Sequence, residues 1–352
     1  MFVLVVCFLL FSKKQKSLYR AFNVPFFIII FVWFFYAMIH DDSAYLTRIF
    51  LLLTAYVCIL YLYRNDYFEK FWIWNNYWIL VQAFLSTLAF VLVSAGILKP
   101  LISIDSARDY VTIHFWGLCS SKSGWNMMFR PAGFFDEPGA LAAWAVYGYM
   151  FNNAFLSDKY ISRYLPIFTV STLSMAFYIQ MAFFYMLSYV KKIYKLIPVL
   201  LFVSVAIHFV SKTEGSENDL YEITVGRFQY DSTKGLAGNN RFNEYQSAVN
   251  LFEQSPIIGV GCRNFDLAND VASDNPYEIL AKDGIVGYFF TYLPLLLILI
   301  YNRRKEIIIA TLVIFLGYQQ RPFHINFLQD LYLWSFYLFV LIDRNKKNRV
   351  FI

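Results

Sequence analysis

Phe22-Asn-Val-Pro-Phe-Phe-Ile-Ile-Ile-Phe-Val-Trp-Phe-Phe-Tyr-Ala-Met-Ile39 is an apolar run without a single charged side chain. A helix needs about 20 such residues to cross the roughly 30 Å of hydrocarbon in a bilayer. The rest of the chain has the same character, because 59% of its 352 residues are hydrophobic and only 15% are charged. Soluble domains carry about 25% charged residues. The sequence therefore predicts an all-α, polytopic integral membrane protein with a single transmembrane domain over residues 1–352.

Several further apolar segments are candidate membrane spans. Together with the run above they cover residues 2–11, 22–39, 47–63, 77–97, 138–156, 164–190, 195–210, 277–301, 306–319 and 329–342. A signal peptide carries its basic residues before the apolar stretch. Here the basic run Lys13-Lys14 follows the first segment, so we interpret residues 2–11 as a short first span.

Basic clusters orient these spans, because cytoplasmic loops are rich in Lys and Arg. Segment 164–190 has basic residues at both ends, so we expect a helical hairpin there that turns near Ser171–Ser174. Two full crossings need about 40 residues, so these two helices must be short. Counting the hairpin as two gives about 11 transmembrane helices, with the N-terminus periplasmic and the C-terminus cytoplasmic. The net charge of +6 then reflects topology and anionic lipid rather than nucleic acid.

Two predicted periplasmic loops, 98–137 and 211–276, are too long to be simple connectors. The second contains an amphipathic helix from Arg241 to Glu253, which Ser255-Pro256 ends. Its apolar positions recur at helical spacing and lie on one face. They are Phe242, Tyr245, Val249 and Phe252. Such a helix would lie on the membrane surface or pack over a cavity.

The first motif that could carry chemistry is Phe129-Arg-Pro-Ala-Gly-Phe-Phe-Asp-Glu-Pro-Gly139, just before a span. Asp136 or Glu137 could simply cap the helix that Pro138 begins. Capping does not explain Arg130. An arginine beside a helix N-terminus at a membrane surface is well suited to bind phosphate.

The second motif is Asn239-Asn-Arg-Phe-Asn-Glu-Tyr245, which leads to Pro256-Ile-Ile-Gly-Val-Gly261. Arg241 and Glu244 share a helical face, and an ordinary ion pair is the simpler interpretation. Gly259 and Gly261 could likewise be turn residues.

The third motif is Asp274-Asn-Pro-Tyr-Glu-Ile-Leu-Ala-Lys-Asp-Gly-Ile-Val-Gly287, which enters a span. Its charged residues Glu278, Lys282 and Asp283 could pair with one another or extend to the interface. The fourth motif, Gln319-Gln-Arg-Pro-Phe-His324, places Arg321 and His324 between the last two spans. Both could be interfacial anchors rather than catalytic groups.

Other patterns are missing from the sequence. The middles of the predicted spans carry no Asp, Glu, Lys or Arg, whereas ion-coupled transporters usually need such groups at mid-depth. No metalloprotease, Walker A or nucleophile-elbow motif occurs. The four cysteines lack metal-ligand spacing, and pairing of Cys119 with Cys262 is left open. We expect neither a metal nor a cofactor.

The Arg-Pro-x-Gly-x-x-x-Glu-Pro-Gly run, the arginine helix followed by Pro-Ile-Ile-Gly-Val-Gly, and the Gly-Ile-Val-Gly at a span start resemble the bacterial O-antigen polymerases of the Wzy type. The related O-antigen ligases share the second and third patterns. The resemblance covers residues 77–342 in order and topology. It implies a GT-C-like glycosyltransferase that needs no metal and acts on undecaprenyl-pyrophosphate-linked oligosaccharides, both donor and acceptor, at the periplasmic face of the inner membrane. A chain-length regulator is a further partner implied for such a polymerase.

The resemblance also implies roles for individual residues. Arg241 matches the family's helix arginine, which binds the donor pyrophosphate. Glu137 and Glu244 are the candidates to orient the acceptor hydroxyl or take its proton. The candidate substrate-binding residues are Arg130, Arg227, Tyr245, Arg321 and His324.

Two alternatives remain open. The ligase, which transfers glycan to lipid A–core, usually carries a catalytic His where this chain has Asp274. The other alternative is a polysaccharide or lipid transporter.

Overall fold

The computed structural model describes residues 16–97, 102–105, 112–115, 120–124, 128–135, 137–189, 230–231, 235–236, 242–268, 275–320 and 326–350. Their contacts divide the chain into two compact units. Unit 1 comprises Met1–Phe71, Asn243–Thr311 and Tyr318–Ile352, and unit 2 comprises Trp72–Phe242 and Leu312–Gly317. The described residues are mostly helical, as predicted.

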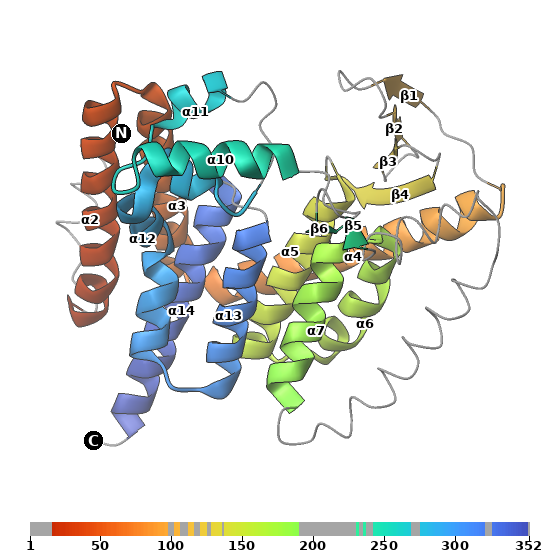
Figure 1. The fold of residues 1–352 in the computed structure, drawn as a ribbon. Coiled ribbons are helices and arrows are strands. Elements are labelled where there is room, and N and C mark those ends of the chain that lie inside the picture. The colour runs from red at the N-terminus through yellow and green to blue at the C-terminus, as the bar shows by residue number, and fades with distance from the viewer. Residues whose placement is uncertain are drawn as a thin grey trace. The chain divides into compact units, whose positions relative to one another are not determined.

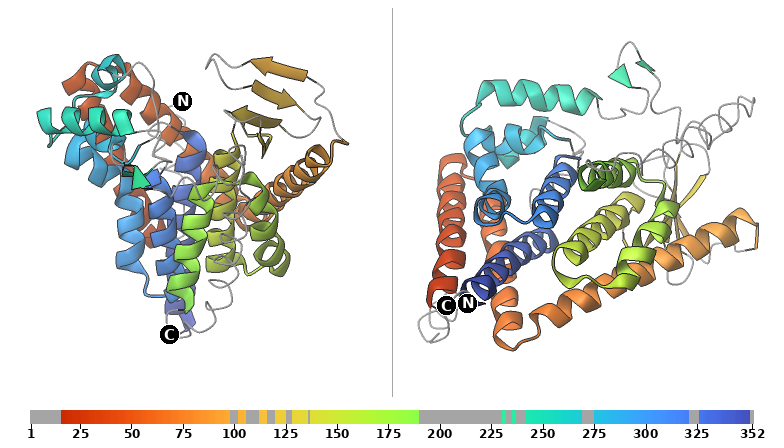
Figure 2. Two further views of the ribbon diagram at one scale, coloured as in Figure 1. Left: turned by 45° about the vertical axis from the view of Figure 1, so that its right-hand side comes forward. Right: turned by 90° about the horizontal axis from the view of Figure 1, so that it is seen from below.

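Four helices form the main bundle of unit 1 (Figures 1 and 2). They are α2 (Lys16–His40), α3 (Ser43–Arg64), α12 (Glu278–Tyr301) and α14 (Phe327–Val350). Aromatic side chains fill the bundle interior: the Phe26 ring stacks on Tyr56 at 4.5 Å and meets Trp334 edge-on at 4.9 Å. Such contacts add to the free energy gained by burying the rings.

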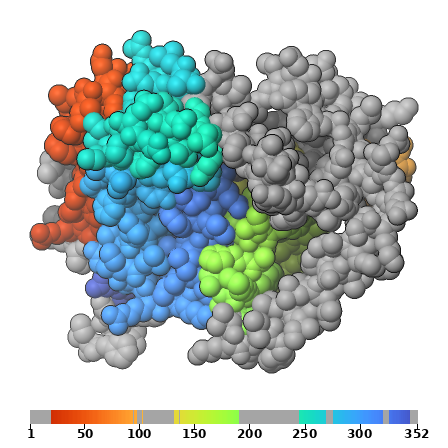
Figure 3. Space-filling view, in the orientation of Figure 1, coloured from red at the N-terminus to blue at the C-terminus, as the bar shows by residue number. Residues whose placement is uncertain are grey.

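Three more helices complete unit 1. They are α10 (Phe242–Gln254), α11 (Cys262–Ala268) and parts of α13 (Lys305–Gln320). Figure 3 shows α10 lying across the upper part of unit 1, above the surface formed by α12. At the other end of the bundle, Arg304 pairs with Asp343 at 3.1 Å and Arg344 lies over the Tyr301 ring. The predicted cytoplasmic clusters containing Arg304 and Arg344 therefore gather at one end.

Unit 2 combines helices with a small sheet. Its helical elements are α4 (Phe68–Ser94, from Trp72 onward), α5 (Pro138–Phe151), the π-helix η1 (Asn152–Leu156), α6 (Lys159–Thr169), the 3-10 helix η2 (Val170–Thr172) and α7 (Met175–Tyr189). The strands are β1 (Ile102–Asp105), β2 (Thr112–Phe115), β3 (Ser120–Gly124) and β4 (Met128–Gly133), with a separate pair β5 (Tyr230–Asp231) and β6 (Gly235–Leu236).

Strands β1 to β4 form an antiparallel meander in chain order. They lie in the predicted loop 98–137, so the all-α prediction is wrong for this segment. Each of these strands has four to six residues, which is too short for alternation to stand out from a loop. The sheet ends at β4, whose last residues lead through Phe134 and Phe135 into α5.

Four described helices are long and apolar enough to cross a membrane: Arg20–His40, Ser43–Arg64, Phe68–Val93 and Glu278–Tyr301. They are candidate membrane spans, and they coincide with the predicted segments 22–39, 47–63, 77–97 and 277–301. The predicted spans 2–11 and 195–210 lie outside the described residues. The count of about 11 spans, the GT-C-like fold and the orientation of the termini stay predictions.

The predicted hairpin in segment 164–190 is confirmed as a break between two helices. Helix α6 ends at Thr169, η2 follows, and Leu173 adopts the left-handed conformation at φ 49° before α7 begins. Both helices pack against α5, and η2 lies against β4. Hydroxyl groups bind the carbonyl oxygens of this turn: Thr87 and Ser171 donate to the Phe168 carbonyl. Tyr178 donates to the Val170 carbonyl.

Candidate functional site

The second and third sequence motifs meet in unit 1. After α10, the segment 256–261 runs beside the first turns of α12 and is tied to it by backbone hydrogen bonds. Val260 N–H donates to the Ala281 carbonyl, and Gly261 N–H donates to the Lys282 carbonyl, both at 2.9 Å. In the reverse direction, Ile285 N–H donates to the Pro256 carbonyl at 2.9 Å. Two motifs that are separate in sequence therefore form one structural element.

Two glycines make this contact possible. Gly259 has φ +71°, and a Cβ placed on it would lie 2.3 Å from the Lys282 carbonyl oxygen. Gly284 has φ +65°, and its Cβ would lie 2.3 Å from the Ile257 carbonyl oxygen. Gly284 also interrupts the helical backbone of α12. These glycines do more than form turns, because each allows two backbones to touch where any side chain would collide.

The predicted amphipathic helix is confirmed as α10. Its inward residue Ala248 is fully buried against Phe265 of α11 and Ala281 of α12, and Phe252 packs beside them. Tyr245 meets the Tyr277 ring edge-on at 5.1 Å, and burial raises the pKa of the Tyr245 hydroxyl. The apolar face of α10 therefore covers the first turns of α12.

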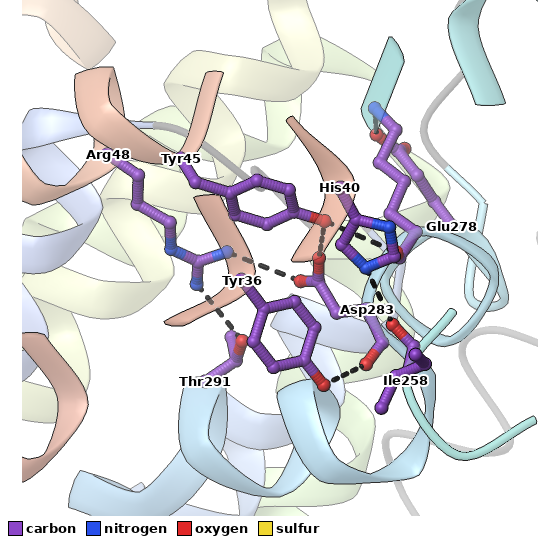
Figure 4. Close-up of polar contacts among 9 residues, drawn as sticks. Tyr36, His40, Tyr45, Arg48, Ile258, Glu278, Asp283 and Thr291 are labelled. Carbon is purple, nitrogen blue, oxygen red and sulfur yellow. Dashed lines mark hydrogen bonds and ion pairs between the residues drawn. The ribbon is translucent and has the colours of Figure 1, made fainter. Parts of the chain in front are cut away.

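Beneath this contact lies a buried ion pair that joins α12 to α3. The Asp283 carboxylate is fully buried: Oδ1 accepts a hydrogen bond from the Tyr45 hydroxyl at 2.8 Å, and Oδ2 lies 3.4 Å from Arg48 Nη1 (Figure 4). Arg48 also donates through Nη2 to Thr291 at 3.0 Å, and its guanidinium lies 3.8 Å from the centre of the Trp33 ring. Charges at such a depth persist only when they are paired and hydrogen-bonded.

Helix α2 contributes two further contacts to this region. The Tyr36 hydroxyl donates to the Asp283 carbonyl at 2.7 Å, next to the backbone break at Gly284 (Figure 4). His40 Nε2 lies 3.2 Å from the Ile258 carbonyl. The end of α2 is thereby joined to both motifs.

The turn between α2 and α3 is joined to α11 through Asp42. One carboxylate oxygen accepts from Ala44 N–H at 2.9 Å and caps α3, while the other accepts from Arg263 N–H at 2.7 Å. The sequence places this turn and the second long loop on the same side of the membrane, and within unit 1 they do lie together.

A second group of charges lies nearer the surface. Lys282 Nζ lies 2.9 Å from Glu278 Oε1, 3.3 Å from Asp266 Oδ1 and 4.7 Å from the centre of the Phe265 ring. Glu278 and Lys282 are buried, whereas the Asp266 side chain is 58% exposed. The mutual pairing considered for Glu278 and Lys282 is confirmed, but Asp283 pairs with a different helix.

Cys262 lies between the two charged groups. It is buried, and its thiol hydrogen-bonds with the Tyr45 hydroxyl. Burial, followed by the nearby Asp283 carboxylate, raises the pKa of this thiol to about 12. The chain therefore holds Cys262 as an unreactive thiol at neutral pH.

The residues predicted from the sequence for catalysis and binding are described only in part. Glu244 lies in α10 and Arg130 in β4 opposite Lys122, but their side chains are outside the described part of the chain. Tyr245 lies against Tyr277, as noted above. Four other predicted residues are outside the described residues altogether: Arg227, Arg241, Arg321 and His324.

Glu137 is the one predicted acid whose side chain is described. It occupies the N-cap position of α5 with Pro138 in the first turn, as the sequence suggested, yet its side chain makes no capping hydrogen bond. The capping interpretation of Glu137 therefore finds no support.

The first motif is anchored to α4 within unit 2. Gly133 has φ +62°, and a Cβ on it would lie 3.0 Å from Gln82 Oε1, which also accepts a hydrogen bond from Phe134 N–H at 3.0 Å. Gln82 is fully buried. Phe134 stacks on Trp78 with ring centres 5.7 Å apart. Gln82 thus fixes the backbone between Arg130 and Glu137.

Sequence reasoning missed the residues from α2 and α3, above all Arg48. One signal could have found it. Arg48 lies at the predicted outer end of a span, where the positive-inside rule disfavours a basic residue, and Asp283 lies at the matching end of another span. Two opposite charges placed in this way suggest an ion pair.

Among the described residues, no group of three or more His, Cys, Asp or Glu side chains is arranged to hold a metal ion. Comparisons of the chain with protein-family models, with curated proteins and with solved structures gave no match.

Proposed function

We propose that this chain is a membrane-embedded glycosyltransferase that polymerises undecaprenyl-pyrophosphate-linked repeat units of O-antigen or a related polysaccharide, at the periplasmic face of a bacterial inner membrane. The observation that supports the proposal is the contact between the second and third motifs. They share one backbone contact, built on Gly259 and Gly284, directly after the helix that Arg241 precedes.

The chemistry of the reaction explains the arginines. A lipid pyrophosphate leaves with negative charge, and fixed cations stabilise that charge in the transition state. Arg130, Arg241 and Arg321 all lie in predicted periplasmic segments. Guanidinium groups bind phosphate oxygens in pairs, which fixes orientation as well as charge.

The acceptor is a sugar hydroxyl, which needs a carboxylate to orient it or take its proton. Glu137 and Glu244 are the candidates. Glu137 follows the turn that Gln82 holds, and Glu244 lies in the first turn of α10. Tyr245, Arg227 and His324 are proposed to contact the substrates.

The buried charges of unit 1 bear on the transporter alternative. Arg48 is the sixth residue of α3, and Asp283 is the sixth residue of α12. At 1.5 Å per residue the pair lies about 8 Å from the helix starts, near the membrane edge rather than at mid-depth. Transporters place such groups near the midplane, so the pair favours the polymerase. Asp274 in place of the ligase histidine disfavours the ligase.

The test is genetic and biochemical. Arg241→Ala and Arg130→Ala should abolish long glycan chains in the host, whereas Arg303→Ala, at the predicted cytoplasmic end, should leave them normal. Membrane insertion is checked for all three by protease protection and size-exclusion chromatography. Normal chain-length ladders in both arginine variants would refute the proposed site.

Deletion of the gene separates the alternatives. Loss of a polymerase leaves lipid A–core that bears a single repeat unit. Loss of a ligase leaves bare core and accumulated lipid-linked glycan. Loss of a transporter of lipid-linked units leaves repeat units on the cytoplasmic side.

A further inference from the structure

A pocket of about 370 Å³ lies in unit 2, where α5 passes through η1 into α6. It is lined by Asn153, Ser157, Lys159, Ser162 and Arg163. Every one of these side chains carries a hydrogen-bond donor, two are cationic, and none is acidic. A lining of donors and cations suits a phosphate group, whose oxygens only accept hydrogen bonds from such partners.

Asp158 is next to the pocket in sequence, but both of its carboxylate oxygens accept hydrogen bonds from other groups. Its Oδ1 accepts from Tyr160 N–H and Ile161 N–H, and its Oδ2 accepts from the Tyr77 hydroxyl at 3.0 Å. The first amides of α6 are therefore already satisfied. Any affinity of the pocket for anions comes from its side chains and not from the helix terminus.

The turn that borders the pocket is fixed by Asn152, which is fully buried. Its Nδ2 donates to the Asp158 carbonyl at 2.9 Å and to the Ser162 hydroxyl at 2.8 Å, while its Oδ1 accepts from Asp158 N–H at 3.0 Å. These bonds hold the backbone of the turn at Asp158 and the Ser162 hydroxyl in place, whereas the Lys159 and Arg163 side chains are exposed and would reach a ligand from the surface.

The surroundings of Arg163 indicate the source of the phosphate. Tyr160 and Ile167 stand three residues before and four residues after it, so all three share one stripe of α6. These flanking side chains are 64% and 58% exposed. An arginine between exposed apolar side chains, at the predicted cytoplasmic end of a membrane helix, is placed to meet a lipid headgroup while its neighbours meet acyl chains.

We propose that this pocket binds the phosphate headgroup of an anionic membrane phospholipid, with Lys159 and Arg163 as its charged ligands. The inference is independent of the proposed glycosyl transfer. Basic pockets between membrane helices on the cytoplasmic side are suited to such headgroups.

The test uses the full-length protein in a neutral detergent, titrated with phosphatidylglycerol and followed by native mass spectrometry. The double variant Lys159→Gln/Arg163→Gln should weaken phosphatidylglycerol binding on the order of thirtyfold, the loss expected for two interfacial cations. Binding of phosphatidylcholine should be unaffected. Lys159→Arg/Arg163→Lys keeps both charges and should retain binding, which would show that positive charge at these positions is what the lipid recognises.

The matched control is Arg303→Gln/Lys305→Gln, which removes the same charge from exposed positions outside the pocket. It should leave phosphatidylglycerol affinity unchanged. Equal losses in the two double variants would overturn the proposal in favour of unspecific surface charge. Unchanged binding in the pocket variant would also overturn it. Inorganic phosphate that binds the lipid-free protein as tightly as the lipid does would show a site for soluble phosphate instead.

Discussion

The carboxylate of Asp283 and the guanidinium of Arg48 form an ion pair at 3.4 Å whose side chains are 0% and 5% exposed. The partners are 235 residues apart in the chain. Asp283 is followed directly by Gly284, so the pair lies beside the backbone contact between the two motifs. The stability of the membrane bundle and the geometry of the α10 region are thus linked through adjacent residues.

Removing one partner of this pair should be costly. Asp283→Ala removes the ion-pair partner of the buried Arg48, and such losses destabilise by about 3–5 kcal/mol. The measurement is thermal unfolding in detergent, followed by fluorescence-detected size exclusion. The double variant Arg48→Leu/Asp283→Leu removes both charges and should be more stable than Asp283→Ala. A double variant no more stable than the single one would contradict this account of the pair.

Alanine at Gly259 or Gly284 should separate the two motifs. The new methyl group would lie 2.3 Å from a backbone oxygen, and the positive φ adds strain. Gly96→Ala is the matched control, because Gly96 has φ +70° with nothing within 4 Å of the added Cβ. The control should show only the cost of the left-handed backbone, about 1–2 kcal/mol. Gly259→Ala and Gly284→Ala should lose clearly more in the same thermal assay.

The pH dependence of Cys262 follows from its raised pKa. The folded thiol has a pKa of about 12, whereas the pKa of an unfolded cysteine is about 8.5. The folded state thus holds this proton more tightly. The resulting stability is complete below about pH 8.5 and is lost as pH rises from there toward 12.

Labelling measures this directly. In a chain that keeps Cys262 as its sole cysteine, maleimide should react slowly at pH 8 until detergent denaturation exposes the thiol. Asp283→Asn removes a charge that raises the pKa, so it should speed labelling at a given pH. Fast labelling of the native wild-type thiol would contradict the burial described above.

Gln82 should be needed to hold the backbone of the first motif in place. Gln82→Leu removes the acceptor for Phe134 N–H, and a buried donor without its partner costs about 1–3 kcal/mol. If the proposed function holds, chain-length ladders should shorten as the backbone between Arg130 and Glu137 loosens. Gln82→Glu keeps an acceptor oxygen and should retain more activity than the leucine variant. Thr54→Leu, on an exposed part of α3, controls for general effects of a polar-to-apolar change.

Local patterns predicted local structure well. The helix break, the amphipathic helix and four apolar helices long enough to span a membrane could be derived, because runs of charge, helical periodicity and proline positions act over a few residues. The meander in loop 98–137 could not be derived, since short strands carry little pattern. Arg48 and Asp283 meet only through tertiary packing, which one sequence does not encode in any local period. The backbone contact built on Gly259 and Gly284 could not be predicted for the same reason.

The hairpin turn has a consequence for how this protein reaches its membrane. Helix α6 has 11 residues and α7 has 15, which correspond to about 17 Å and 23 Å against roughly 30 Å of hydrocarbon. Neither helix is long enough to be stable across the bilayer alone. The hydroxyls that satisfy the turn are supplied in part by Thr87 of α4, a helix made earlier in synthesis. We therefore expect biogenesis of this region to be cooperative, with the hairpin entering the membrane as one body after α4 is in place.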